Sequence, residues 1–407
     1  MRTIYADNNA TTQVAPEVYE AMIPFFTEDC FNPSSMYEPA RHTADAVADA
    51  RTRIARRLGA SDPREIIFTS CATESNNAAI LGAAKANPER RHVITTAVEH
   101  PAVLEVCKEL GRDGYDVTFL PVDGDGNLDL ATFIQAIRAD TLLVTVMHGN
   151  NETGVIFPVE QLSRVVKETD PTILFHTDAT QSLGKLPIDL GGAFRHVDLL
   201  TFSGHKLHAP KGIGALYVRR GTPLRPFMIG GHQEEGRRAG TENVPYIVGL
   251  GKAVDLVEAS READEARIAT LRDRLEQAIE ERIPYVQVNG KNAPRLPNTL
   301  NVSCHAIEGE SILELLGNEG ICASSGSACT TGSLEPSHVL TAMNVPPAAI
   351  QGAVRFSLSR YNTEDDVDRI IDVFPGIVAS LRRASPFWDS QKQEPRADAR
   401  SVLEKPA

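Results

Sequence analysis

The side chains best suited to chemistry in this chain follow short apolar runs, where strands are expected to end. Lys206 comes after Ser-Gly-His, directly behind the apolar run 198–202. A lysine held at a strand end and partly removed from water has a lowered pKa and can form a Schiff base with a carbonyl compound. Because most lysines are simple surface charges, Lys206 alone does not decide between these two interpretations.

Four further residues supply what a phosphorylated ring compound would need. Thr73 lies where SCATESNNAAI turns into a predicted helix, and Ser203 and His205 flank Lys206. The free N–H groups of a helix start bind phosphate, although Thr73 as a plain helix cap is equally compatible with the sequence. Asp178 ends the apolar run 173–176, and a buried carboxylate needs a cationic partner, either a ring nitrogen or an arginine. Together these groups match the needs of pyridoxal phosphate.

These residues must be positioned by elements that bring several strand ends to one edge. Short apolar runs alternate with segments of helical period such as 101–111, 129–139 and 158–168, which predicts an α/β domain with a mostly parallel sheet over 15–255. The expected strands are 66–68, 92–98, 117–121, 142–147, 173–176, 198–202 and 213–218. Five of these runs are followed by polar or ionisable residues, and ligands bind beyond the carboxyl ends of parallel strands.

The rhythm changes after residue 245. A long charged helix is expected over 246–283, followed by strands at 286–289, 299–304 and 353–358 and by helices at 309–317 and 363–383. We interpret 1–14 and 256–385 as a smaller α+β domain that carries Cys329. Residues 386–407 are polar and contain proline, so we expect a disordered tail.

Composition narrows the possible functions. The 407 residues are 42% hydrophobic and 23% charged, with a formal charge of −13. An acidic balance without Lys/Arg runs argues against nucleic-acid binding. The chain shows neither a signal-peptide pattern nor an apolar stretch near the ~18–20 residues of a membrane span, so we expect a cytoplasmic protein without membrane contact. The six cysteines form no C-x-x-C pair, which leaves a structural zinc site unsupported.

The motifs of nearly the whole chain, from 5 to 388, resemble those of pyridoxal-phosphate-dependent cysteine desulfurases. These enzymes have fold type I and belong to the aminotransferase class V superfamily, and several details are most similar to the nitrogen-fixation branch. The motifs are YADNNATT, FNPSSMY, SCATESNN, VEHPAV, NNETG, HTDATQSLGK, SGHKLHAPKGIGALY, RRAGTEN, LPNTLNVS, SSGSACTTGSLEPSHVL, VRFSLSRYNTEDDVD and RRASPFW.

The resemblance implies a large domain with a seven-stranded sheet, and roles for individual residues. Lys206 would attach the cofactor, Asp178 would pair with its ring nitrogen, and Gln181 would bond its phenolic oxygen. Asn151 and Arg355 would bind the substrate carboxylate, a task for which a bidentate guanidinium is well suited. The full set expected to bind the cofactor is Ala72, Thr73, His100, Asn151, Asp178, Gln181, Ser203, His205, Lys206 and, from the neighbouring subunit of a homodimer, Thr241.

The expected catalytic residues are Lys206, His100 and Cys329. The resemblance implies that Lys206 removes the α-proton of L-cysteine, that His100 stacks on the ring and helps to move protons, and that the thiolate of Cys329 attacks the substrate sulfur. The products would be alanine and a persulfide on Cys329, which supplies sulfur to an iron–sulfur scaffold or another acceptor, plausibly for nitrogenase clusters. Transient iron–sulfur ligation by Cys329 is a further extrapolation. The Ser/Gly/Thr-rich stretch 323–337 predicts a mobile tether for that thiol.

Two other functions remain open on the sequence. One is a different reaction on the same fold, such as that of a selenocysteine lyase or an aminotransferase, and the latter would not need Cys329. The other is a sulfur-relay scaffold with a vestigial cofactor site. One departure from related sequences is Glu234-Glu235-Gly236, where Glu-Arg-Gly is common, which puts a local ion pair in doubt.

Overall fold

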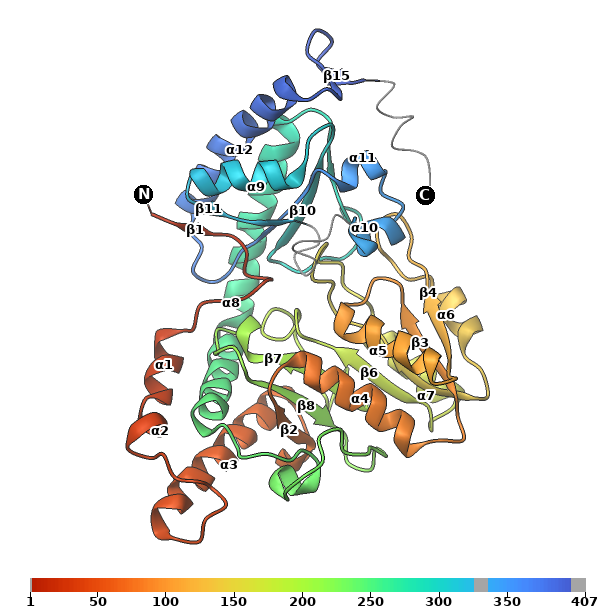
Figure 1. Ribbon diagram of the computed structural model, residues 1–407, viewed down its shortest axis with the longest axis vertical. Helices are drawn as coiled ribbons and strands as arrows, with labels where there is room; N and C mark the ends of the chain where they lie inside the picture. The colour runs from red at the N-terminus through yellow and green to blue at the C-terminus, as the bar shows by residue number, and fades with distance from the viewer. Residues whose placement is uncertain (1, 326–335, 397–407) are drawn as a thin grey trace.

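The structure is a computed structural model that describes residues 2–325 and 336–396 of the chain (Figure 1). Cys329 and most of the stretch expected to be a mobile tether lie outside the described residues. The described part forms two layered units, a large one around a seven-stranded sheet and a smaller one around a four-stranded sheet.

The seven-stranded sheet confirms the strands expected from the apolar runs. Its order is β2-β8-β7-β6-β5-β3-β4, and β8 is antiparallel to both of its neighbours while β3 to β7 pair in parallel. The bounds are β2 Ile66–Thr69, β3 His92–Thr96, β4 Asp116–Leu120, β5 Thr141–Thr145, β6 Leu174–Asp178, β7 Leu199–Ser203 and β8 Gly214–Val218. The α/β class with a mostly parallel sheet is therefore confirmed.

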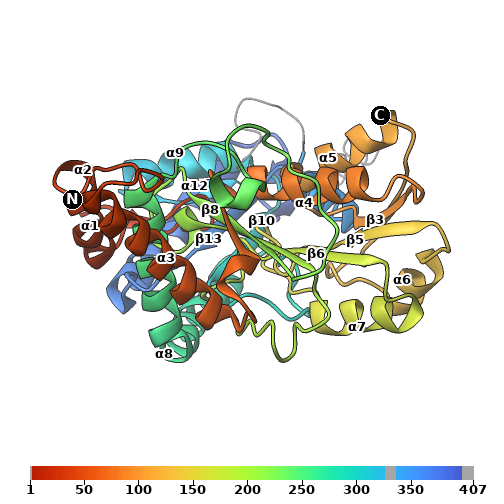
Figure 2. The same cartoon turned by 90° about the horizontal axis from the view of Figure 1, so that it is seen from below.

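Helices cover both faces of this sheet because successive strand residues point to opposite sides. Ile66 and Phe68 belong to one core and Ile67 to another, as the two-residue period of a strand requires. Helices α4 (Ala72–Ala86) and α5 (Pro101–Arg112) lie on one side of the sheet, and α6 (Leu130–Ala136) and α7 (Val159–Thr169) lie on the other (Figure 2). The face of α6 and α7 is extended by α1 (Pro16–Met22), α2 (Pro24–Thr27), α3 (Glu38–Leu58) and the first half of α8 (Val244–Arg282).

The smaller unit is an antiparallel sheet of order β12-β13-β10-β9 packed against helices (Figure 1). Its core contains the second half of α8, so this 39-residue helix spans both units. The bounds are β9 Val286–Val288, β10 Thr299–Cys304, α9 Gly309–Asn318, β12 Ser324–Ser325, α10 His338–Ala342, α11 Pro347–Ile350, β13 Ala353–Ser357 and α12 Glu364–Ala384. The N-terminal strand β1 (Ile4–Tyr5) pairs in parallel with β11 (Ile321–Cys322).

The chain after α12 differs from the expected disordered tail. Residues 388–395 form a small hairpin, β14 (Trp388–Asp389) with β15 (Glu394–Pro395), and Trp388 is 4% exposed. The Trp388 ring packs edge-on against Tyr285, and the guanidinium of Arg382 lies 4.4 Å from its centroid. One buried tryptophan outweighs the polar composition of its neighbours, because it removes a large apolar area from water. Residues 397–407 lie outside the described part.

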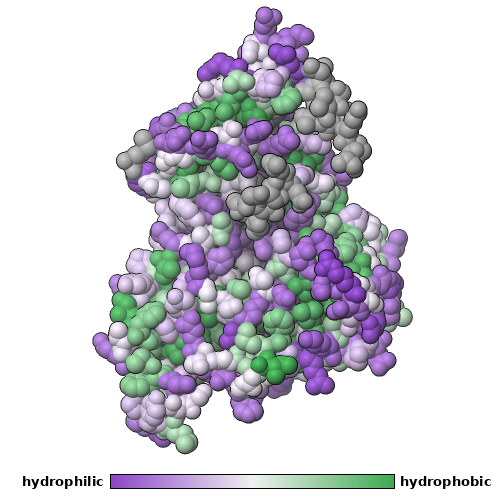
Figure 3. Space-filling view, viewed as in Figure 1, coloured by the Kyte–Doolittle hydropathy of each residue, from purple (hydrophilic) through white to green (hydrophobic). Residues whose placement is uncertain are grey.

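The surface shown in Figure 3 is largely hydrophilic, with scattered apolar patches. Across the described residues, no helix combines the length and apolar character needed to cross a membrane. Large apolar side chains that remain exposed include Met36, Tyr37, Phe227, Met228 and Ile229.

Candidate active site

A cavity of about 270 Å³ opens at the carboxyl ends of the parallel strands. Ten of the residues expected at a cofactor or substrate site line it: Ala72, Thr73, His100, Asn151, Asp178, Gln181, Ser203, His205, Lys206 and Arg355. The remaining lining residues are Asn9, Ala10, Cys71, Ala102, Met147, Gly149 and Thr180. Strand ends that are distant in sequence are thus brought together, as the sheet topology requires.

Lys206 enters this cavity from a short 3₁₀ turn, Gly204–Lys206, that directly follows β7. Its Nζ donates to the carbonyl oxygens of Asn9 and Ala10, the latter at 2.7 Å. Sequence reasoning assigned no role to Asn9 and Ala10, although they belong to the motif YADNNATT. The N-terminal segment therefore passes beside the lysine and fixes where its amine lies.

Asp178 is a buried carboxylate that faces the cavity from the end of β6. Asn76 Nδ2 donates to its Oδ2 at 2.7 Å, and the backbone N–H of Thr180 donates to its Oδ1 at 2.9 Å. Both donors are neutral. Among the described residues, Asp178 forms no ion pair with an arginine, so the alternative of an arginine partner is not supported. A buried negative charge without a cationic partner is costly, and a protonated ring nitrogen would offset that cost.

A phosphate would fit at the start of α4, beside β7. Cys71 is the N-cap residue of α4 and makes no side-chain capping bond, and the first N–H groups of any helix lack intrahelical partners. Ser203 Oγ is buried and has no hydrogen-bond partner within the described chain. Thr73 lies in the first turn of α4 rather than capping it, and it is exposed. This arrangement of N–H groups and hydroxyls is a typical anion site.

Gly214, the first residue of β8, makes the approach of β8 to the start of α4 possible. A Cβ atom built there would lie 2.9 Å from the carbonyl carbon of Cys71 and 2.9 Å from the Phe202 oxygen. Both are backbone atoms, which cannot move as a flexible side chain can. Gly214, the second glycine of GIGALY, therefore allows the start of α4 to pack against the sheet.

His100 is both a structural and a candidate functional residue. Its Nδ1 accepts from the backbone N–H of Ala102 at 3.1 Å and so caps α5, whose first residue is Pro101. Burial lowers the pKa of His100, so the ring is neutral near pH 7. Because Nδ1 accepts, the ring hydrogen resides on Nε2, which can donate a hydrogen bond to other groups.

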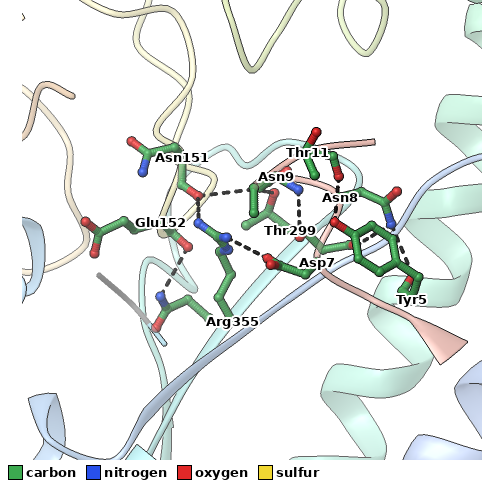
Figure 4. Close-up of polar contacts among 12 residues, drawn as sticks. Tyr5, Asp7, Asn8, Asn9, Thr11, Asn151, Glu152, Thr299 and Arg355 are labelled. Carbon is green, nitrogen blue, oxygen red and sulfur yellow. Dashed lines mark hydrogen bonds and ion pairs between the residues drawn. The ribbon is translucent and has the colours of Figure 1, made fainter. Parts of the chain in front are cut away.

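Arg355 lies on β13 of the smaller unit and lines the cavity (Figure 4). It is 1% exposed, and its guanidinium donates to Asp7 Oδ1 and to the Asn151 carbonyl oxygen, both at 2.8 Å. Its Nε is buried and has no partner in the described part of the chain. Asp7 was not anticipated from the sequence, and it holds one edge of the guanidinium while other N–H groups remain for a ligand.

Asn9 and two neighbouring side chains complete the polar lining. Gln181 Nε2 donates to the Asn9 carbonyl oxygen at 3.0 Å, and its second hydrogen remains for a ligand oxygen. Asn9 Nδ2 in turn donates to Thr299 Oγ1 at 2.9 Å (Figure 4). His205 Nδ1 lies 3.2 Å from Thr11 Oγ1, and burial beside Lys206 lowers the pKa of His205 to about 4.

One expected residue does not line this cavity, and another lies outside the described residues. Thr241 is exposed and does not line it. Cys329, the expected nucleophile and extrapolated metal ligand, lies outside the described residues. Within the described ranges, no three or more His, Cys, Asp or Glu residues gather in a way that could hold a metal ion.

At the Glu234-Glu235-Gly236 departure, the differing residue Glu235 forms an ion pair with Arg237 at 3.8 Å, and Glu234 forms another with Arg51. Glu234 is buried and accepts from both terminal nitrogens of Arg51, at 2.7 and 2.8 Å. Its Oε2 also accepts from the backbone N–H of Phe68 at 3.3 Å. The side chain of Glu235 is exposed, so the doubt raised by the sequence does not extend to the cavity.

The lining residues fit pyridoxal phosphate. A carboxylate without a cation, a helix start with an unpartnered serine hydroxyl beside it, and a lysine amine at a strand end are the groups that this cofactor requires. The fit rests on orphaned polar groups, because a buried polar atom without a partner is uncommon unless a ligand supplies one.

Comparison with known proteins agrees with this chemistry. A cysteine desulfurase of Trichormus azollae is 56% identical over 391 residues, which are 96% of each chain. The cysteine desulfurase NifS of Azotobacter vinelandii is 52% identical over 388 residues, 95% of this chain and 96% of that protein. A solved NifS-like protein matches with a TM-score of 0.87 and 39% identity, covering 93% of this chain and all of that one.

The fold is accordingly type I, the fold of the pyridoxal-phosphate enzymes to which these relatives belong. The model of the family described as aminotransferase class-V matches residues 4–370. This match and the relatives above cover nearly the whole chain, including every residue that lines the cavity. The chain therefore belongs to the aminotransferase class-V family, whose cofactor is pyridoxal phosphate.

Proposed function

We propose that this protein is a cysteine desulfurase that converts L-cysteine into L-alanine and leaves a persulfide on Cys329. In this reaction the substrate C–S bond breaks, an S–S bond to Cys329 forms, and the carbon ends as the methyl group of alanine. The observation that carries the proposal is the cavity in which Lys206, Asp178 and Arg355 converge, in a chain similar to curated cysteine desulfurases.

The residues around the cavity would divide the work. Bound pyridoxal phosphate supplies an electron sink for a carbanion at the substrate Cα. Arg355 and Asn151 would orient the substrate carboxylate, because a guanidinium binds a carboxylate bidentately. The Lys206 amine would attach the cofactor and, once displaced by substrate, move the proton at Cα. His100 Nε2–H would serve proton transfer near the departing sulfur.

Chain length is consistent with Cys329 as the sulfur acceptor. Ser324 is in register with Arg355 in the β12–β13 pair, which places the last described residue before the gap close to the cavity. Cys329 follows Ser325 by four residues, so the chain allows at most about 14 Å between their Cα atoms. A cysteine in that range suits an intramolecular attack on a substrate held by Arg355.

The test is a visible spectrum of the purified protein, followed by incubation with L-cysteine and assay of alanine and sulfide. We expect a yellow protein that forms both products. Cys329→Ala should keep the cofactor absorbance and release no sulfide, because the nucleophile is lost. Normal turnover by Cys329→Ala would remove the role of this thiol, and a colourless protein would support the scaffold alternative instead.

The same assay separates the remaining alternatives. An aminotransferase would return the cofactor in its amine form and would not depend on Cys329. A selenocysteine lyase would prefer L-selenocysteine over L-cysteine in direct competition. Lys206→Ala should abolish product formation in every case, which makes it a control for cofactor-dependent chemistry.

We further propose an iron–sulfur scaffold protein as the sulfur acceptor, in nitrogenase cluster assembly. The support is the likeness to NifS of Azotobacter vinelandii. Transfer of labelled sulfur from Cys329 to a purified scaffold would test the acceptor. Absence of cluster formation on that scaffold, with intact alanine release, would restrict the protein to another acceptor. Transient cluster ligation by Cys329 would appear as iron-dependent absorbance that Cys329→Ala lacks.

Finally, we propose a homodimer in which Thr241 reaches the neighbouring subunit's cofactor phosphate, and a division of each chain into a 15–255 large domain and a 1–14 plus 256–385 small domain. Thr241 is exposed and lies three residues before α8, whose Tyr246 packs edge-on against Phe26 of α2. Exposed apolar residues of 227–229 lie on the preceding loop. Exposed apolar side chains close in sequence to Thr241 are the kind of feature expected at a subunit contact.

A further inference from the structure

Glu152 is a buried acid next to the cavity that the proposed reaction does not use. It lies in the loop between β5 and α7, and it is 3% exposed. Its backbone N–H donates to Asn150 Oδ1 at 2.9 Å, and its carbonyl oxygen accepts from Asn301 Nδ2 at 3.1 Å. The backbone of Glu152 is therefore fixed on both sides, which determines where its carboxyl group points.

That carboxyl group accepts a hydrogen bond from Ser337, which lies near the start of the described range 336–396. Ser337 Oγ donates to Glu152 Oε2 at 2.5 Å, and Ser337 is itself 4% exposed. The same Oγ accepts from the backbone N–H of Leu340 at 3.1 Å and so caps α10. The neighbouring His338 donates through Nε2 to the Glu99 carbonyl oxygen at 2.9 Å. The start of α10 is thus tied to two loops that also form the cavity.

The described residues that precede 326 contact the same part of the structure. Ser324 pairs in register with Arg355, and Arg355 donates to the carbonyl oxygen of Asn151, the residue before Glu152. Ser324 and Ser337, which lie on either side of 326–335, are therefore joined to Arg355 and Glu152 respectively. Figure 4 shows Arg355 beside the loop that carries Asn151 and Glu152. The loop that would help to bind substrate is also the loop that binds Ser337.

We propose that Glu152 is a positioning residue that fixes Ser337, eight residues after Cys329 in the chain, and thereby limits how far Cys329 can lie from the substrate carboxylate site at Arg355. This inference rests on the proposed desulfurase reaction, in which Cys329 must meet a sulfur atom held by Arg355. Fixing the end of a short chain raises the effective concentration of a group that the chain carries. Glu152 is not among the residues that line the cavity, so we assign its effect to Ser337.

Protonation leaves this tie intact near neutral pH. Burial raises the pKa of Glu152 to about 7, while the Ser337 hydroxyl and the nearby Arg355 charge favour the ionised form. An ionised carboxylate accepts from Ser337 Oγ, and a neutral acid can still accept through one oxygen. Glu152→Gln should therefore preserve the tie, because the amide oxygen accepts in the same place.

The test compares Glu152→Ala, Ser337→Ala, the double variant and Glu152→Gln in the cofactor-loaded protein. Alanine formation in a single turnover with L-cysteine should fall roughly tenfold in each Ala variant, the effect of losing one buried hydrogen bond to a charged group. The double variant should fall by about the same factor rather than about a hundredfold, because the two side chains form one interaction. Glu152→Gln should stay within about threefold of the wild type.

One measurement and one control variant separate positioning of Cys329 from a change in its reactivity or a general loss of structure. Alkylation of Cys329 by iodoacetamide, a reagent that diffuses freely, should not slow in the Ala variants. Ser303→Ala is the matched control, because Ser303 is equally buried and accepts from Asn289 Nδ2 at 2.9 Å without contacting Glu152 or residues 336–340. It should leave single-turnover alanine formation unchanged.

The inference is overturned if the Ala variants transfer sulfur at the wild-type rate, if their effects multiply, or if alkylation slows in parallel. A wild-type protein that forms no alanine would instead refute the proposed function. In that case hydrogen exchange still tests the hydrogen bond between Glu152 and Ser337. The α10 amides should exchange faster in Ser337→Ala and Glu152→Ala than in Ser303→Ala. Equal exchange would refute the tie itself.

Discussion

Asp178 and Glu99 are both buried acids, but only Asp178 lines the cavity. Asp178 faces the cavity and accepts from two N–H groups, one of them Asn76 Nδ2. Glu99 is fully buried, and burial raises its pKa to about 8 despite bonds from Thr96 and Met147. Glu99 is thus neutral at pH 7, whereas Asp178 lines the cavity in which a cationic ring would bind.

Replacing Asp178 with Asn should remove that charge while keeping the shape. We expect turnover to fall at least about 100-fold, or roughly 3 kcal/mol, because the ring nitrogen loses its buried anionic partner. Cofactor affinity should weaken as well, which equilibrium dialysis would show alongside alanine formation. Thr177→Val is the control, since Thr177 Oγ1 is buried and makes no hydrogen bond in the described chain. Equal turnover in the two variants would contradict the pairing.

Glu99 predicts how stability depends on pH. Its pKa is about 8 in the folded protein against 4.5 ordinarily, so between these values the folded state keeps a proton that the unfolded chain releases. The free energy of unfolding should therefore fall as pH rises from 4.5 to 8, with a slope of up to ~1.4 kcal/mol per pH unit. Glu99→Gln should lack this component. Denaturant unfolding of both proteins from pH 5 to 8 measures the difference, and parallel curves would contradict the neutral state.

Two elements meet where the phosphate is expected: the start of α4 and the first residue of β8. The helix start presents N–H groups, and the strand supports it through contact of backbone with backbone at Gly214. The site therefore depends on a close approach between elements as well as on the side chains they carry.

Gly214→Ala should push these two elements apart. A Cβ atom 2.9 Å from the backbone of Cys71 and Phe202 forces a shift, so we expect a loss of about 1–3 kcal/mol in unfolding free energy. Cofactor affinity should fall as the helix start moves, measured by dialysis. Gly111→Ala in α5 is the matched control, because its Cβ would meet nothing within 4 Å, and it should be neutral or stabilising by up to ~1 kcal/mol. Similar behaviour of the two variants would show that the close approach is unimportant.

At the scale of the whole molecule, the described chain leaves several large apolar side chains exposed, among them those of 227–229 on the loop that precedes α8. Met36 is 95% exposed and Ile229 is 88% exposed. Side chains of this size are costly to leave in water when they gather on one surface. A second copy of the chain would cover them and bring Thr241 near the other cavity.

Ile229→Asp should therefore weaken self-association. We expect a lower dimer fraction at micromolar concentration by light scattering, because a charge would be buried without a partner. Ile134→Asp is the control, since Ile134 is 46% exposed on α6, on another part of the surface. If both variants stay dimeric, or if the wild type is monomeric, the proposed subunit contact is wrong.

Much of the fold could be predicted because the spacing of apolar residues within a short segment indicates whether it forms a strand or a helix. Each apolar run that was expected to be a strand lies within or next to an observed strand, and residues 363–366 form the expected helix start with Thr363 as the cap. The residues around Lys206 and Asp178 could be singled out because parallel strands end at a common edge. The tail was misjudged because the burial of Trp388 depends on Tyr285 and Arg382, which are distant in sequence.

The sequence by itself determined which chemistry the chain can perform: the lysine, the carboxylate, the helix start and the arginine are identifiable from type and position. Only the tertiary structure decided how they are held. The carbonyls of Asn9 and Ala10 at Lys206, the Asp7 contact of Arg355 and the Ser337 bond to Glu152 each join residues more than 180 positions apart. Such contacts leave no local pattern, because their partners are selected by the packing of two units against each other rather than by the period of one element.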